Sequence, residues 1–254
     1  MKTIFSANLI ITIFLLCLPT MGQSQVNHFY YNYLENENKV EFGVKAGVNI
    51  SRFHGLDNEA KTKAGFVGGL TLDINFSKDF YLLTGFDFLN KGTKVNLRMN
   101  YEGMNLLFEK TTIDAMYLHM PVHAGYKIWI NDKTKLSLHG GPYIAYGIGG
   151  QLKLSDNVIK TLNDGTTITE SMNDFVNIVK GFKRSWDTFG EKTPNGVHMD
   201  MYKRFDWGLG AGASLQYDKT VLSVNYDFGL TNISRGAGNV KNRVGYITLG
   251  YKFN

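Results

Sequence analysis

Three histidines are the side chains whose types and spacing could do chemistry. His119 and His123 lie on one strand-like segment and His139 on the next, all at positions of polar parity. If segment 131–134 is a tight turn, His123 and His139 become diagonal neighbours on paired strands, about 7–8 Å apart between Cα atoms. Two imidazoles at that separation could share a metal ion.

The other ligands of a metal site are missing. The single cysteine, Cys17, lies in the N-terminal apolar run, and no obvious inward carboxylate lies beside the histidine pair, so the set is incomplete by the rules for zinc. A hydrogen-bonded network inside a narrow barrel is the favoured alternative, because side chains fill such an interior. We therefore expect no cofactor and keep His119, His123 and His139 as alternative metal candidates.

A hydrolytic site has less support in the sequence. His54, His198 and Ser185 fall between the predicted strands, far apart, and no motif orders them as nucleophile and base. We therefore predict no catalytic residues and no enzyme. A lipid A-modifying barrel enzyme is a less favoured alternative.

The elements that would position these side chains are strands. From Val40 to Ile50, every even position is apolar, and the odd positions hold glycines or the polar residues Glu41, Lys45 and Asn49. This period of two indicates a strand with one apolar and one polar face. Similar stretches follow at 64–76, 80–90, 113–130, 135–149, 205–217, 220–233 and 243–253. The count is even, and stretches of about 11 to 18 residues suit strands that cross a bilayer at a tilt.

The connections between these strands alternate in length. The tight ones are 77–79, 131–134 and 218–219, and the long ones are 51–63, 91–112, 150–204 and 234–242. Short turns on one side and long loops on the other are typical of a transmembrane meander. The pattern predicts an all-β fold, an eight-stranded antiparallel up-and-down transmembrane barrel. Its long loops would lie outside the cell and both its ends in the periplasm.

A soluble β-sandwich or lipocalin-like barrel would show the same alternation, with the apolar face turned inward. Aromatic residues at the short-turn ends of the strands favour the membrane, because an aromatic girdle lies at that level. The predicted girdle consists of Phe76, Phe80, Tyr217, Tyr251 and Phe253. We therefore expect an integral protein of the bacterial outer membrane.

The first 24 residues have the parts of a secretion signal. Lys2 provides the basic start, an apolar run extends from Leu9 to Leu18, and small residues follow around Gly22. A run of about ten residues is too short for a spanning helix. We expect a signal peptide over 1–24 cleaved near residues 22–24, a periplasmic lead over 25–38 and one barrel domain over 39–254 in a Gram-negative envelope.

The polar faces of the predicted strands carry charges of both signs. Buried charges must be paired, because an unpaired buried charge is very costly. We therefore expect a filled interior with little or no ion conductance. The predicted interior network consists of Glu41, Lys45, Asp73, Asp87, Lys127, Asp206 and Asp227.

The longest predicted loop, 150–204, contains a helix signal. Ser171 and Asp174 resemble a capping box, and apolar residues follow at helical spacing, which predicts a short amphipathic helix over about 172–183. This apolar face could cap the barrel mouth, lie on the outer leaflet, dock a partner or pack on neighbouring loops. It consists of Met172, Phe175, Val176, Val179 and Phe182.

Charge gives only general information about partners. The formal net charge is +5, and no run of basic residues suggests nucleic acid. Lys91, Lys94 and Arg98 fall in a predicted outer loop and could meet the phosphates of lipopolysaccharide. We expect outer-membrane lipid, lipopolysaccharide and other envelope proteins as partners of a monomeric barrel.

Several short motifs occur in the order in which one known family carries them. They are Gly43-Val-Lys-Ala-Gly-Val-Asn-Ile-Ser51, Tyr117-Leu-His-Met-Pro-Val122, Gly140-Gly-Pro-Tyr143, Phe205-Asp-Trp-Gly-Leu-Gly210, Tyr226-Asp-Phe-Gly-Leu-Thr-Asn232 and Leu249-Gly-Tyr-Lys-Phe253. Over essentially the whole mature chain, the sequence resembles the PorT-like "porin family" class of small outer-membrane β-barrels. It departs from that class where Asn254 follows Phe253 and where 150–204 exceeds a minimal loop.

The resemblance implies a fold and a location, and it allows an accessory role in secretion. One barrel scaffold hosts pores, adhesins, enzymes and secretion parts, so it does not fix an activity. We expect a non-enzymatic structural or interaction component of the outer membrane. The alternative is a small porin or a ligand-binding barrel for a small solute.

Overall fold

The computed structural model describes residues 39–55, 60–101, 104–162, 165–179, 184–190, 202–236 and 238–253. The predicted signal peptide and periplasmic lead, together with Phe182 and His198, lie outside the described residues. Among those described, no helix is long and apolar enough to cross a membrane.

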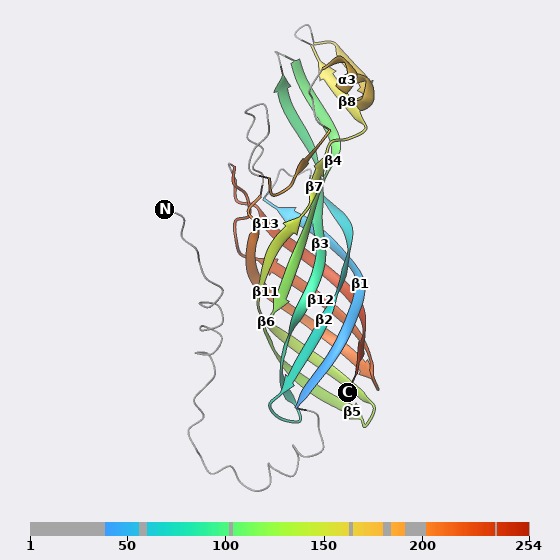
Figure 1. Ribbon diagram of the computed structural model, residues 1–254, viewed down its shortest axis with the longest axis vertical. Helices are drawn as coiled ribbons and strands as arrows, with labels where there is room; N and C mark the ends of the chain where they lie inside the picture. Colours follow the sequence, from blue (N-terminus) through green and yellow to red (C-terminus); the bar gives the residue numbers. More distant parts are fainter. Residues whose placement is uncertain are drawn as a thin grey trace, which may run out of the picture. The chain divides into compact units, whose positions relative to one another are not determined.

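Eight strand crossings form one closed antiparallel ring, which confirms the predicted barrel (Figure 1). The order around the ring follows the sequence, so the barrel is an up-and-down meander. Its strands are β1 (Val40–His54), β2 (Lys61–Asn75), β3 (Phe80–Tyr101), β4 (Met104–Pro121), β5 (His123–Asn131), β6 (Thr134–Gly149), β11 (Phe205–Tyr217), β12 (Thr220–Gly229) and β13 (Lys241–Lys252).

The last strand closes the ring by pairing with the first. The β1–β13 register extends from Gly43 opposite Lys252 to His54 opposite Lys241. Because side chains alternate along a strand, this register puts Ile247 and Leu249 on the outer face, where both are exposed, while Tyr246 is buried inside. The last strand thus pairs with the first, as a closed barrel requires.

One crossing is interrupted. β4 and β5 both lie between β3 and β6, and they are separated only at Val122, so together they make the single strand that the sequence predicts over 113–130. Pro121 cannot donate a ladder hydrogen bond, which explains the break. The Val122 N–H still donates to the carbonyl of Pro142, at 2.9 Å.

The structure corrects the predicted loop over 91–112. β3 and β4 continue well past the barrel as a paired hairpin, with Tyr101 opposite Met104. A bulge between Val95 and Leu97 bends this ladder, and Lys110 has a φ of 57° beside it. The segment is therefore strand rather than loop, since its residues are paired along nearly their whole length.

The predicted loop over 150–204 also contains regular structure. Its elements are β7 (Gln151–Lys153), β8 (Asn157–Thr161), β9 (Thr167–Ser171), α3 (Met172–Ile178) and β10 (Ser185–Asp187). β8 pairs with the far part of β4 and with β9, whereas β7 pairs with β4 nearer the barrel and with β10. We call the far parts of β3 and β4, with β8, β9 and α3, the outer extension. It lies at the end of the barrel opposite β5 and the C-terminus (Figure 1).

Candidate functional site in the barrel interior

The barrel interior contains three levels of charged side chains. The lowest level, nearest the short turns, centres on Glu41 of β1. Its Oε1 accepts hydrogen bonds from the Nζ atoms of Lys127, at 3.0 Å, and Lys135, at 3.4 Å. Lys252 contacts the other oxygen of Glu41 and also lies 2.5 Å from Asp73 Oδ2. Two carboxylates therefore face three ammonium groups, all buried.

The middle level centres on His119 of β4, which is fully buried. Its Nδ1 lies 3.4 Å from Asp87 Oδ2 and its Nε2 lies 3.3 Å from Asp227 Oδ2. Lys45 makes a second contact with Asp87, at 2.9 Å. The imidazole thus bridges two acids from opposite parts of the ring, and the lysine balances one of them.

The upper level joins Lys91 of β3 to Asp206 of β11, with 3.4 Å between Nζ and Oδ2. The same carboxylate oxygen accepts from Asn242 Nδ2, at 2.7 Å, and from the Tyr143 hydroxyl, at 3.3 Å. Lys91 Nζ also lies 4.9 Å and 5.1 Å from the ring centroids of Tyr117 and Tyr143, which adds cation–π attraction.

Apolar side chains close the barrel above this upper level. Phe189, which follows β10, packs edge-on against Tyr117 with 5.5 Å between ring centroids, and its ring fills the space beside Gly147. Phe53 of β1 packs in the same way against Tyr202, at 5.1 Å. These buried rings belong to a cluster that continues into the outer extension, so the charged levels are sealed from that end.

The predicted histidine pair forms, but through a hydrogen bond. Gly125 is opposite His139, which makes His123 the diagonal neighbour as expected, and the two Nδ1 atoms are 2.9 Å apart. One ring must donate and the other must accept, so at least one imidazole has a bare Nδ1. His119 lies against Asp87 and Asp227 instead, and no group of three or more potential metal-binding side chains occurs among the described residues.

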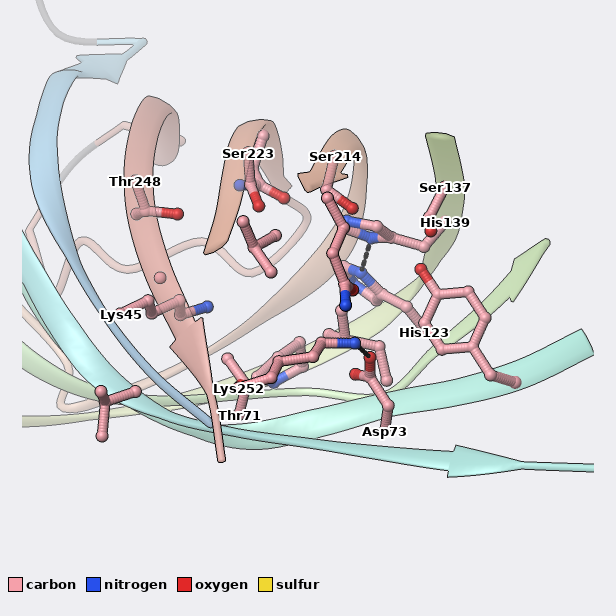
Figure 2. A pocket seen from close by; sticks show the side chains of 18 of the residues that line it. Lys45, Thr71, Asp73, His123, Ser137, His139, Ser214, Ser223, Thr248 and Lys252 are labelled. Atoms are coloured by element: carbon pink, nitrogen blue, oxygen red, sulfur yellow. Dashed lines mark hydrogen bonds and ion pairs between the residues drawn. The ribbon is translucent and has the colours of Figure 1, made fainter. Parts of the chain in front are cut away.

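A small cavity lies between the middle and lowest levels, because residues of both levels line it (Figure 2). Lys45, Lys252 and the histidine pair line it, together with hydroxyl groups such as Ser137, Ser214 and Thr248. Its volume is about 50 Å³. Because one water needs roughly 10–15 Å³ on this measure, the cavity has room for a few waters.

The structure places all seven predicted network residues inside the barrel. Three lysines that complete the network were not in the predicted set: Lys91, Lys135 and Lys252. Lys91 corrects the expectation of a lipopolysaccharide contact, because its side chain is fully buried. The sequence does contain a signal for these lysines, because side chains alternate between the two faces of a strand. Lys91 is an even number of residues from the inward Asp87, and Lys252 is next to the outward Tyr251.

The five residues of the predicted girdle lie on the outer surface at the short-turn ends of their strands. All are at least 47% exposed. Phe80 and Tyr126 pack edge to face at 5.0 Å, and so do Tyr251 and Phe253 at 5.8 Å. Aromatic side chains therefore form neighbouring pairs at this rim, where a girdle stabilises a barrel at the membrane interface.

The helix α3 begins as predicted and ends earlier. Ser171 caps it, accepting from the Asn173 N–H at 3.2 Å, and the helix ends at Ile178 rather than near residue 183. Met172 and Phe175 are fully buried in the outer extension, and Val176 and Val179 pack against the same cluster. Of the alternatives for this apolar face, these four residues show packing on neighbouring segments, so they do not form the partner surface.

Of the candidate hydrolytic residues, the structure describes His54 and Ser185, and it does not bring these two into a catalytic arrangement. His54 lies at the end of β1 opposite Lys241, and Ser185 lies on β10 opposite Lys153. Both side chains are exposed, on different strands and with different partners.

Comparison with known proteins identifies the family. Residues 23–235 match the family described as outer membrane protein beta-barrel domain. The chain belongs to this family. The protein is therefore an integral β-barrel of the outer membrane, and the apolar belt on the outside of the ring faces lipid.

Solved outer-membrane barrels are similar to this one. Ail, the attachment invasion locus protein of Yersinia pestis, is 17% identical, with 85% of this chain and 100% of Ail covered and a TM-score of 0.35. OprG from Pseudomonas aeruginosa is 12% identical, with 86% of this chain and 98% of OprG covered and a TM-score of 0.41. The Neisserial surface protein A is 13% identical, with 83% of this chain and 95% of that protein covered and a TM-score of 0.37. No curated protein matches the chain.

Proposed function

We propose that this outer-membrane barrel is a non-enzymatic, non-conducting structural and interaction component of the envelope. The observation that carries the proposal is the filled interior. Oppositely charged side chains lie in contact across the barrel at three levels, and the ring of Phe189 closes it beside Gly147. An ion would have to displace these paired groups, which costs far more than diffusion through a water-filled pore.

The small porin and the solute-binding barrel have less support. A site for a small solute usually encloses about 300–1,000 Å³. The interior cavity offers about 50 Å³, and two pairs of its lining groups already contact each other, His123 with His139 and Lys252 with Asp73.

Contacts with other molecules then belong to the outer extension and the outer surface. The buried cluster that closes the barrel continues into the outer extension around Phe175, so the extension presents a formed surface rather than a loose loop. The resemblance to PorT-like barrels supports a finer proposal, that the partners are components of a secretion system and that the barrel acts as one monomer beside them. Lipopolysaccharide is proposed as its lipid partner.

Conductance in planar bilayers tests the main proposal. The purified protein should insert without stable single-channel steps, whereas a general porin inserted in the same way should give them. Large, stable steps from the wild-type protein would overturn it.

Two further measurements test the finer parts. Cross-linking in intact outer membranes should enrich secretion components with the wild type and lose them when 157–178 is deleted; equal enrichment would refute a role for the outer extension. The mass spectrum of lipid A should be the same with and without the protein. A changed lipid A profile would show an enzyme.

A further inference from the structure

Four basic residues lie in opposed pairs on the outer face of the barrel, near the outer extension. Arg52 of β1 is directly opposite Arg243 of β13, and His54 is directly opposite Lys241. The like charges of Arg52 and Arg243 at directly opposed positions destabilise the sheet. Within the part of the chain that the structure describes, none of the four makes an ion pair. An anion between Arg52 and Arg243 would remove this repulsion.

Arg243 is held in place for such a contact. Its Nη1 donates to the carbonyl of Gly229, at 2.9 Å, and its guanidinium carbon lies 4.6 Å from the ring centroid of Phe228. Phe228 is 49% exposed on the lipid-facing side, so the guanidinium lies on the outer surface of the barrel. A planar guanidinium fixed in this way matches the geometry of a phosphate group.

An apolar notch lies beside the arginine pair, at the next outward-facing position of β13 toward the membrane centre. Gly245 follows Arg243 on the outer face of β13, with Ile50 on one side and Tyr226 on the other. A Cβ atom at Gly245 would find Tyr226 at 3.5 Å and Ile50 at 3.8 Å, so the missing side chain leaves an open space with apolar walls. The next outward residue, Ile247, continues the lipid-facing belt.

We propose that Arg52, Arg243 and the Gly245 notch form a binding site for one phosphate-bearing lipid of the outer leaflet. The phosphate lies between the two guanidinium groups, with Lys241 beside them, and an acyl chain lies in the notch. The order of the groups along the strands matches such a lipid, because cations come first from the outer end and apolar walls follow toward the membrane centre. This site deepens the lipid part of the proposed function and rests on it.

The test uses the full-length protein in nanodiscs and native mass spectrometry. The wild type should retain lipid A that carries its phosphates in preference to lipid A from which they have been removed. R52Q together with R243Q should lower this retention about tenfold or more, because charge-assisted bonds to the phosphate are lost. The matched control is K110Q, which removes an exposed cation of the outer extension and should retain lipid as the wild type does.

The variant G245L separates the lipid from a free anion. The new side chain has ordinary contacts available, so the barrel should keep its heat-modifiable gel migration while the notch is filled. Retention of lipid A should fall, whereas titration with inorganic phosphate should be unchanged. If inorganic phosphate binds as tightly as lipid A and G245L changes neither affinity, the ligand of this site is a soluble anion and not a lipid.

Other outcomes overturn the site outright. Equal retention of lipid A with and without its phosphates would show that the arginine pair does not bind a headgroup. Unchanged retention of lipid A in the double variant R52Q R243Q would show the same. Neither readout depends on conductance. A wild-type barrel that conducts and still retains lipid A would therefore overturn the proposed function and leave this site intact.

Discussion

Lys91 Nζ lies 3.4 Å from Asp206 Oδ2, and both side chains are fully buried although 115 residues separate them in the sequence. The pair joins β3 to β11 across the barrel. It lies just below the apolar rings that close the outer end, so it marks the last charged level of the filled interior. Its integrity should matter for stability more than any surface ion pair, since surface pairs contribute about 0–1 kcal/mol.

Breaking this pair from either side should destabilise the barrel strongly. Lys91→Met or Asp206→Asn each leaves one buried charge without its partner, with an expected loss of about 3–5 kcal/mol in the free energy of unfolding. The combined variant should lose less than the sum, by about 0.5–3 kcal/mol, because both charges are then absent. Urea unfolding in lipid vesicles, followed by tryptophan fluorescence, measures this. Strict additivity would show that the two groups do not interact.

The lowest charged level should depend on Glu41 more than on any lysine around it. Glu41→Gln leaves Lys127, Lys135 and Lys252 with Asp73 as the remaining acid in this level, so we expect a loss of about 3–5 kcal/mol. The matched control is Glu109→Gln at an exposed position, expected within about 0.5 kcal/mol of wild type. Equal unfolding curves for the two variants would contradict the proposed role of this cluster.

The closing ring of Phe189 should be displaced by a single methyl group. A Cβ atom at Gly147 would lie 2.3 Å from Phe189 Cζ, whereas one at Gly149 on the same strand would meet nothing within 4 Å. Gly147→Ala should therefore cost about 1–3 kcal/mol through overpacking, and Gly149→Ala should cost less. Proteolysis of segment 184–190 should become faster in Gly147→Ala alone. Equal rates in both variants would show that Phe189 does not seal the barrel.

The outer extension should unfold separately from the barrel. Phe175→Ala removes a fully buried ring, and a change of this kind costs about 3–5 kcal/mol, which should loosen α3 and β8. Ile178→Ala on the same helix is the control, since Ile178 is 67% exposed. Limited proteolysis should cut the extension in Phe175→Ala, while heat-modifiable migration shows an intact barrel. Loss of the barrel band would mean that the extension is required for folding.

Much of the fold could be predicted because a β-strand alternates its faces with every residue. That period assigns Asp87 to the interior and Phe86 to lipid without any knowledge of the neighbouring strands. The alternation of short and long connections adds the topology of the meander. The same argument fails where strands continue beyond the membrane, so the sequence predicts that β3 ends at residue 90 and that the next strand begins at residue 113.

The sequence by itself determined the class of fold, the direction of each strand's polar face and most of the acids inside. Only the tertiary structure decided which lysine meets which acid, because those contacts depend on closure of the ring and on register between strands. It also decided that the apolar face of α3 packs inward and that Arg52 faces Arg243. The position of a residue along its strand determines which way its side chain points, but closure of the barrel determines which side chains it contacts.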